Sequence, residues 1–399
     1  MSDTAQHTAP LSPLLVLATI LCAVGFALDL MEITLSNALA AVFSAPPYSL
    51  RPGQLSLLLA CVYAGAAIGA PTLGWLADRR GLQKVLMLTL LWLGLTSVLA
   101  VVSASFTWFA TFRFLSGLAL GAYPPLMIAY LTTVAPPRYR GMLIFMVCAV
   151  AYLAPPVTIF AIRYLTPLQP FGIEAWRWPF AVGGCLALLV GAGFVRLPEA
   201  VRASPTARKA PQTRRFAFIA TLYFLHPWAT VAFPLLTGPV LLQKGVGLTD
   251  TLLYIGAAAM GPAIGTLLGG LIIDRVSRRV AMVACCCLML VAAALFFVAE
   301  VPIGLLIAVV SYGVGVALYS PSMTLYGAEI FPAASRASAT ASAWALNRVA
   351  SAIVPFALLP VLHTRGPGFV AIAVCAGLIA SIVLIVSCGP RGAAGEALE

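Results

Sequence analysis

The sequence predicts an all-α membrane protein, with twelve transmembrane helices arranged in two pseudo-symmetric halves of six. Of its 399 residues, 62% are hydrophobic and only 9% are charged, whereas a soluble domain has about a quarter charged residues. The apolar residues also fall in continuous blocks of about 20, the length of one helix that crosses a bilayer. A soluble enzyme, a β-barrel porin and a disordered chain are therefore excluded.

The predicted spans are apolar blocks bounded by charges and by proline or glycine clusters. They lie at 12–43, 54–77, 85–103, 107–134, 142–163, 177–196, 216–243, 250–273, 280–300, 302–328, 338–362 and 367–388. The first block is too long for the apolar region of a signal peptide and contains acidic residues, so we expect a retained span.

The connections between spans are short except at the midpoint of the chain. Residues 197–215 are basic and rich in proline, serine and alanine, which is typical of a linker. We therefore expect residues 1–196 and 216–399 to form the two six-helix halves, joined by this segment.

The net charge of +11 is concentrated in alternate loops between the spans. Such loops lie in the cytoplasm under the positive-inside rule, so both termini and the linker are expected there and the protein in a bacterial inner membrane. Because the charge is accounted for by topology, no nucleic-acid partner is expected. The loops richest in lysine and arginine are 78–84, 135–141, 197–215 and 274–279.

Two loops repeat at one offset along the chain. Asp78 and Arg79 in GWLADRRGLQK match Asp274 and Arg275 in GGLIIDRVSRR, 196 residues later. VAPPRYRG and IFPAASRA align at the same offset. Two independent matches at one offset indicate a duplication, with the halves related by an axis along the membrane normal.

These motifs resemble those of the major facilitator superfamily. G-x-L-A-D-R-x-G after the second span is similar to that family's loop signature, and RFLSGLALG in the fourth span has its R-x-x-x-G-x-x-x-G spacing. WRWPF, RLPEAVR, AEIFPAASRASA and LDLMEI resemble the metabolite:proton symporter and sugar-porter branch, including niacin-type members. The resemblance implies transport by alternating access, and it maps Glu32 onto the proton-linked acid of the first helix.

Charged residues inside the spans are the sharpest functional signal, because each costs about 2.5–3.5 kcal/mol in a bilayer. Asp29 and Glu32 share one face of the first span. We interpret Glu32 as the proton carrier, helped by Asp29 and by Arg113 as a salt-bridge partner. Salt bridges that only lock the first helix to its neighbours are the alternative.

Arg348 in the eleventh span has no acid within its own span. Its planar guanidinium suits a carboxylate, so we expect it to bind the anionic group of a substrate. As an alternative, it reaches the cytoplasmic end of the helix or donates to backbone carbonyls.

Further candidates for substrate contact are polar or aromatic residues within spans, each with a packing role as the alternative. They are Tyr123 beside the Pro124-Pro125 break, His226, Trp228, Asn37, Asn347 and Tyr319.

In the loops, we expect a cytoplasmic latch between the halves, formed by Asp78, Arg79, Arg80 and Gly81 together with Asp274 and Arg275. The glycine patterns GAAIGA and GAAAMGPAIG are interpreted as helix-packing sites.

The sequence contains no nucleotide-binding, metalloprotease, hydrolase or redox motif. We therefore expect no enzyme activity, cofactor or metal, and a driving force from an ion gradient. The predicted function is proton-coupled uptake of a small organic anion by a monomer. A proton-driven drug or metabolite exporter is the main alternative, followed by a non-transporting membrane sensor, and a neutral sugar facilitator is disfavoured by the four charges within spans.

Overall fold

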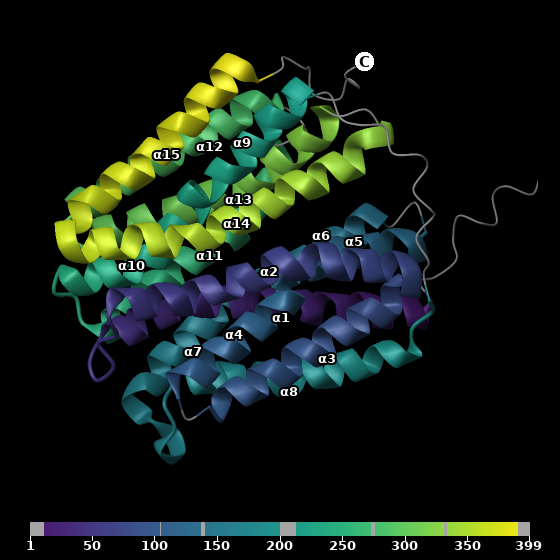
Figure 1. Cartoon of the computed structure of the whole chain (residues 1–399), viewed down its shortest axis with the longest axis horizontal. Coiled ribbons are helices and arrows are strands. Elements are labelled where there is room, and N and C mark those ends of the chain that lie inside the picture. Colours follow the sequence, from purple (N-terminus) through teal and green to yellow (C-terminus); the bar gives the residue numbers. More distant parts are fainter. Residues whose placement is uncertain are drawn as a thin grey trace, which may run out of the picture.

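The computed structural model describes residues 12–103, 105–136, 140–199, 213–272, 276–330 and 333–389, and this part of the chain is helical without strands. Short 3₁₀ turns, η2 (Pro170–Gly172) and η3 (Phe194–Arg196), flank the helix α8. The α-helices, labelled in Figure 1, are α1 (Pro13–Ser44), α2 (Pro52–Arg80), α3 (Leu82–Val101), α4 (Phe106–Leu120), α5 (Tyr123–Val134), α6 (Arg140–Ala151), α7 (Ala154–Leu168), α8 (Arg177–Gly193), α9 (Thr213–Thr230), α10 (Ala232–Gln243), α11 (Leu248–Ile272), α12 (Arg278–Val298), α13 (Pro302–Ile330), α14 (Ala333–Arg365) and α15 (Pro367–Cys388).

Three of the predicted spans are each divided into two helices: α4 and α5, α6 and α7, and α9 and α10. In each pair the second helix has proline in its first turn, at Pro124, Pro155 or Pro234. Proline lacks the N–H that would continue the ladder of the preceding helix, so the chain breaks there.

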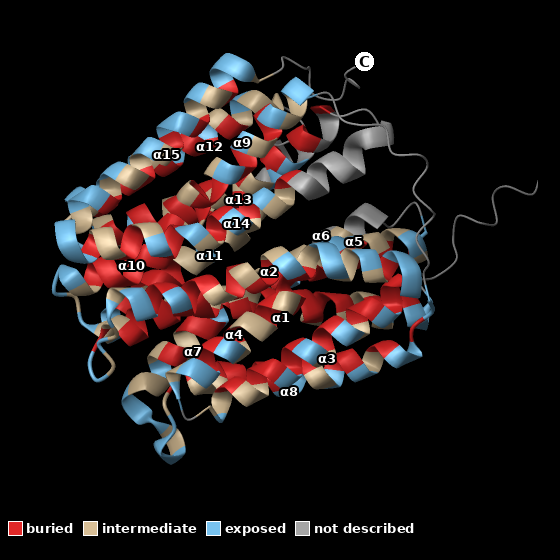
Figure 2. Ribbon diagram, viewed as in Figure 1, coloured by how far each residue is buried: buried red, intermediate tan, exposed pale blue. Residues whose placement is uncertain are grey.

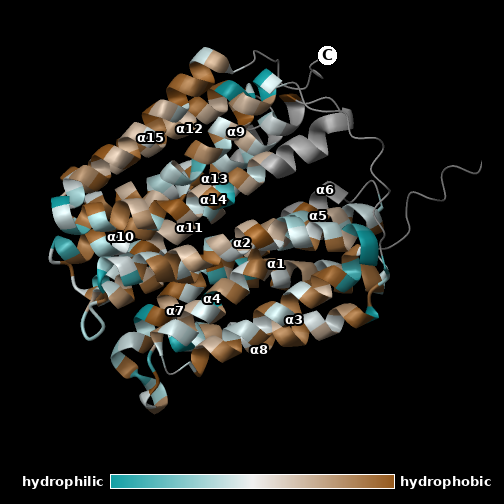
Figure 3. Cartoon of the chain, viewed as in Figure 1, coloured by the Kyte–Doolittle hydropathy of each residue, from teal (hydrophilic) through white to brown (hydrophobic). Residues whose placement is uncertain are grey.

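The described helices account for the predicted membrane spans. Eleven of them, counting each divided pair once, are long and apolar enough to cross a membrane. The 25-residue α11 occupies the place of the eighth predicted span. Large apolar side chains such as Val182, Leu189 and Val291 are exposed on the outer faces of the bundle, where hydropathy and exposure coincide (Figures 2 and 3). The chain is therefore a multi-pass membrane protein.

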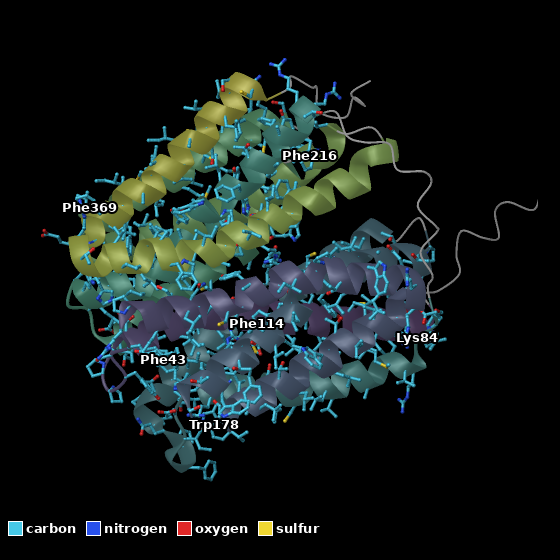
Figure 4. The ribbon with its side chains drawn as sticks, in the orientation of Figure 1. Phe43, Lys84, Phe114, Trp178, Phe216 and Phe369 are labelled. Atoms are coloured by element: carbon cyan, nitrogen blue, oxygen red, sulfur yellow. The ribbon has the colours of Figure 1, made fainter. Side chains whose placement is uncertain are left out.

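Two helical bundles lie side by side, one formed by α1–α8 and the other by α9–α15 (Figure 1). Between the bundles, α1 packs against α10, α2 against α14 and α7 against α11. One end of the molecule contains Phe43 and Phe369, and the other contains Lys84 and Phe216 (Figure 4). We call these the Phe43 end and the Lys84 end.

The bundles are joined at the Phe43 end. Ser56 Oγ donates a hydrogen bond of 2.9 Å to the carbonyl of Pro355, and Arg163 Nε donates one of 3.1 Å to the carbonyl of Thr249. Both bonds connect the N-terminal bundle to the C-terminal bundle. Toward the Lys84 end, α2 and α14 diverge (Figure 1).

Close glycine contacts are repeated in the two bundles, as the sequence duplication predicts. A Cβ atom on Gly117 of α4 would lie 2.2 Å from the carbonyl oxygen of Val62 in α2. A Cβ atom on Gly313 of α13, 196 residues later, would lie 2.4 Å from the carbonyl oxygen of Ala258 in α11. The equivalent helix pairs of the two halves thus pack backbone against backbone. The glycines of the two patterns lie in the same contacts, because a Cβ on Gly65 would lie 2.2 Å from the carbonyl oxygen of Phe114 and one on Gly261 would lie 2.6 Å from the backbone of Gly313. This confirms their interpretation as packing sites.

We expect Gly117→Ala to lower the thermal stability of the purified protein. Because the added Cβ meets the backbone of Val62, α2 and α4 must separate, and overpacking of this kind costs about 1–3 kcal/mol. Gly74→Ala is the matched control, since nothing lies within 4 Å of a Cβ at Gly74. Thermal unfolding in detergent measures both variants, and equal unfolding temperatures would contradict the backbone contact.

Candidate functional site

Glu32 and Arg113 form a buried ion pair inside the N-terminal bundle, and each side chain is only 1% exposed. One terminal nitrogen of Arg113 donates to the Glu32 carboxylate. The other donates to the backbone carbonyl of Glu32 at 3.2 Å and to Ser36 Oγ at 3.0 Å. The Ser97 hydroxyl donates to the second carboxylate oxygen. The salt-bridge partnership predicted for these residues is therefore present, and it connects α1, α3 and α4.

This arrangement makes the Glu32 carboxylate dependent on a single cation. The Arg113 guanidinium also lies 5.1 Å from the centre of the Phe180 ring, and no described residue hydrogen-bonds to its Nε. In a buried pair, loss of either charge leaves the other uncompensated, at a cost of about 3–5 kcal/mol. A proton on Glu32 would have this effect, so the pair has the chemistry of a proton-operated contact between helices.

Asp29 lies one helical turn before Glu32 but has a different environment. It is also 1% exposed, yet neither of its carboxylate oxygens has a hydrogen-bond partner among the residues that the structure describes. Its charge interacts with that of Arg348 in α14, from the opposite bundle. Asp29 and Arg348 do not form an ion pair: the ion pairs among the described residues, with nitrogen and oxygen within 4 Å, involve other side chains.

Arg348 lies beside Trp344, with the centre of its guanidinium 5.1 Å from the aromatic ring. Its Nε is buried and has no hydrogen-bond partner within the described part of the chain. Tyr63 of α2 interacts electrostatically with both Arg348 and Arg113, and so belongs to the same charged region. Tyr63 was not predicted from the sequence, although it is the one tyrosine of α2 and lies two residues before the glycine pattern.

His226 is held in a hydrogen-bonded network that connects three helices. Its Nε2 lies 2.9 Å from Ser320 Oγ, and its Nδ1 lies 3.0 Å from the amide nitrogen of Asn347. That amide nitrogen also donates to the carbonyl of Tyr223 at 3.2 Å, so its hydrogens point toward both acceptors. Nδ1 therefore accepts, and Nε2 carries the proton of a neutral imidazole. His226 and Asn347 consequently fit the packing alternative. Their hydrogen bond holds α14 against α9 at the turn that carries Arg348.

The remaining candidates make local contacts. The Tyr123 hydroxyl donates to the carbonyl of Cys22 at 3.4 Å, and a Cβ on Gly25 would lie 2.0 Å from that hydroxyl. The Tyr319 ring stacks on His226 at 5.4 Å. Trp228 lies against Gly377 of α15. Asn37 is half-buried, and no hydrogen bond of its side chain appears among the described residues.

The loop predicted to act as a latch is attached to its own bundle. The backbone N–H of Gln83 donates to Glu199 Oε1 at 3.1 Å, and Lys84 Nζ lies 3.8 Å from Glu199 Oε2. Gly81 has a φ of +94°, which favours glycine at this sharp connection. Arg79 lies 4.1 Å from the centre of the Trp75 ring.

The contact of Glu199, in the segment after α8, with this loop was not predicted from the sequence. Glu199 belongs to the RLPEAVR motif, which was the signal that could have indicated it. On the side of the second half, Asp274 and Arg275 lie outside the described residues. A contact of the loop with the opposite half stays a prediction.

Two bundles related by an internal repeat, with ionisable side chains buried inside membrane spans, define the architecture of a secondary membrane transporter. The chain belongs to the Major Facilitator Superfamily, whose family model matches residues 15–355. It is therefore a member of a transporter family and not an enzyme.

Curated relatives of this chain are transporters of small metabolites. It is 23% identical to a putative niacin/nicotinamide transporter NiaP of Bacillus subtilis (strain 168), over 92% of this chain and 93% of that protein. It is 29% identical to a 3-(3-hydroxy-phenyl)propionate transporter of Escherichia coli (strain K12), over 58% of this chain and 59% of that protein. Its match to the niacin transporter NiaP of Acinetobacter baylyi, 29% identical, covers 39% of this chain and only 34% of the relative.

A solved structure with the same fold is the partially occluded, inward-open xylose transporter XylE from E. coli. The two agree with a TM-score of 0.78 at 14% sequence identity, over 95% of this chain and 98% of XylE. At that identity the likeness shows the fold alone.

Proposed function

We propose that this protein takes up a small organic anion together with protons, by alternating access. The observation that supports an anionic substrate is Arg348, a guanidinium between the two bundles that has an aromatic neighbour and no ion-pair partner among the described residues. A carboxylate would supply the missing charge and accept from the planar fork of donors. Niacin and 3-(3-hydroxyphenyl)propionate, in the names of two relatives, are both compact aromatic carboxylates.

We assign the driving proton to Glu32. Its carboxylate alternates between the ion pair with Arg113 and the protonated form, and in the ion pair it also accepts a hydrogen bond from Ser97. Loss of the pair loosens the contact between α1 and α4, and this links the proton to the conformation of the bundle.

The joined Phe43 end and the diverging Lys84 end support an inward-facing state of the carrier. The Lys84 end carries the basic loop after α2, which the positive-inside rule places in the cytoplasm. We therefore place both termini and the central linker on the cytoplasmic side, and we propose that the protein acts as a monomer in a bacterial inner membrane.

Ligand-dependent thermal unfolding of the purified protein tests the substrate class. Niacin and nicotinamide are a matched pair, because they differ in a carboxylate against a neutral amide. We expect niacin or 3-(3-hydroxyphenyl)propionate to raise the unfolding temperature, since a ligand at 100 times its Kd stabilises by about 2.7 kcal/mol. Stabilisation by nicotinamide or by xylose, the substrate of the transporter with the same fold, without any by the two acids, would contradict an anion carrier.

A further inference from the structure

The connection between α7 and α8, residues 169–176, has an inverted arrangement of polar and apolar side chains. It lies between a membrane span that ends at Leu168 and one that begins at Arg177. Its polar groups turn toward the protein and its large apolar side chains turn outward, whereas a loop in water has the opposite arrangement. We propose that this connection, here called the Phe171 loop, is a membrane-interface anchor whose apolar tip lies among the lipids of the leaflet at the Phe43 end.

The polar side chains at the base of the Phe171 loop are bound to the protein. Glu174 pairs with Arg177 at 2.8 Å and also accepts a hydrogen bond from the Tyr48 hydroxyl. The indole N–H of Trp176 donates to the same hydroxyl at 3.1 Å. Arg177 donates in addition to the carbonyl of Val101. The charges of this segment are therefore neutralised within the N-terminal bundle, and its base is fixed to the connection between α1 and α2.

The tip of the loop presents apolar side chains to the surroundings of the bundle. Phe171 is 91% exposed, and Leu168 and Ile173 on either side of it are exposed as well. No charged residue occurs from Tyr164 to Ile173. Phe171 also has a φ of +58°, in the left-handed region that favours glycine, so a bulky apolar side chain is kept at the tip despite its conformational cost. An exposed apolar patch of this kind marks a contact with a membrane or with another protein.

The surface that continues from the tip identifies lipid as the partner. Val157, Tyr164 and Leu168 are exposed along one side of α7, at intervals of seven and four residues that follow the helical repeat. On α8, Val182 and Leu189 are exposed, again seven residues apart. These stripes face the hydrocarbon of the bilayer, and the Phe171 loop connects the two helices that carry them. The loop projects from the N-terminal bundle on the side away from the C-terminal bundle (Figure 1), so the lipid around α7 and α8 reaches it.

Tryptophan fluorescence of the full-length protein in lipid vesicles tests the anchor. The vesicles contain phosphatidylcholine, either unmodified or brominated in its acyl chains, because bromine quenches an indole only at short range. Phe171→Trp replaces one exposed aromatic side chain with another, so the fold is retained. We expect the emission that this variant adds to the wild-type spectrum to lose most of its intensity in the brominated lipid. Iodide in the aqueous phase should quench the added emission little.

Two native tryptophans, two residues apart, supply matched controls. Trp178 lies at the edge of the N-terminal bundle (Figure 4), and its ring centre is 6.3 Å from that of Phe171. Trp176 is buried and packs against Phe109, with ring centres 5.0 Å apart. The emission that Trp178→Phe removes should therefore be quenched by the brominated lipid, and the emission that Trp176→Phe removes should not.

Two outcomes for Phe171→Trp would overturn the proposal. Quenching of the added emission by iodide and not by the brominated lipid would place the tip in water. Emission that is insensitive to both quenchers would mean that protein covers the tip, and a dependence on the protein-to-lipid ratio would then identify the cover as a second copy of this chain.

Discussion

Uphill accumulation of the substrate is expected to disappear in Glu32→Gln, while exchange of substrate across the membrane continues. Glutamine has the shape of a protonated glutamate but cannot release a proton. Exchange needs only the loaded forms of the carrier, whereas net uptake requires the empty carrier to return after the proton has left. The variant should therefore exchange its substrate across the membrane without net uptake.

Proteoliposomes with an imposed pH gradient measure both activities in the same preparation. Exchange of labelled for unlabelled niacin serves as the control for folding, which is needed because Glu32→Gln leaves the buried Arg113 without its counter-charge. Asp29→Asn is the comparison variant, and we expect a smaller loss of accumulation there because Glu32 still carries its proton. Full accumulation in Glu32→Gln would remove Glu32 from the coupling mechanism.

The fold and the Glu32–Arg113 pair could be predicted because both depend on features visible within one half of the chain. Span lengths follow from the thickness of the bilayer. Charges are so rare in the spans that Arg113 was the available partner for an acid of the first helix. The glycine contacts between α2 and α4 likewise follow from small residues at a regular spacing.

The relation of Asp29 to Arg348 could not be predicted, because it depends on how the two halves dock. Their positions are far apart in the sequence, and neither lies in a motif that specifies the other. The neutral state of His226 was also beyond the sequence, since it follows from hydrogen bonds contributed by α13 and α14. A single polar residue in a span therefore indicates a buried interaction. Whether that interaction is structural or functional depends on which residue of another helix it contacts.

Arg348→Lys separates uptake of an anion from export of a cation. Lysine keeps the positive charge but loses the planar fork that matches a carboxylate. A hydrogen bond to a charged group contributes about 1.5–3 kcal/mol, so we expect niacin to bind roughly tenfold to a hundredfold more weakly to Arg348→Lys. Arg348→Ala, which also removes the charge, should bind niacin more weakly still.

The neutral amide supplies the control for this series. Nicotinamide should bind the wild type about as weakly as niacin binds Arg348→Lys, and its affinity should change little between the two proteins, since it presents no carboxylate to the guanidinium. A cation exporter predicts the opposite pattern, because loss of a repelling charge would leave binding of its substrate unchanged or make it tighter. Calorimetric Kd values for both ligands in the wild type, Arg348→Lys and Arg348→Ala distinguish these cases. Equal niacin affinities across the three proteins would exclude Arg348 as the carboxylate receptor and favour export, because the guanidinium between the bundles would then have no part in holding the ligand.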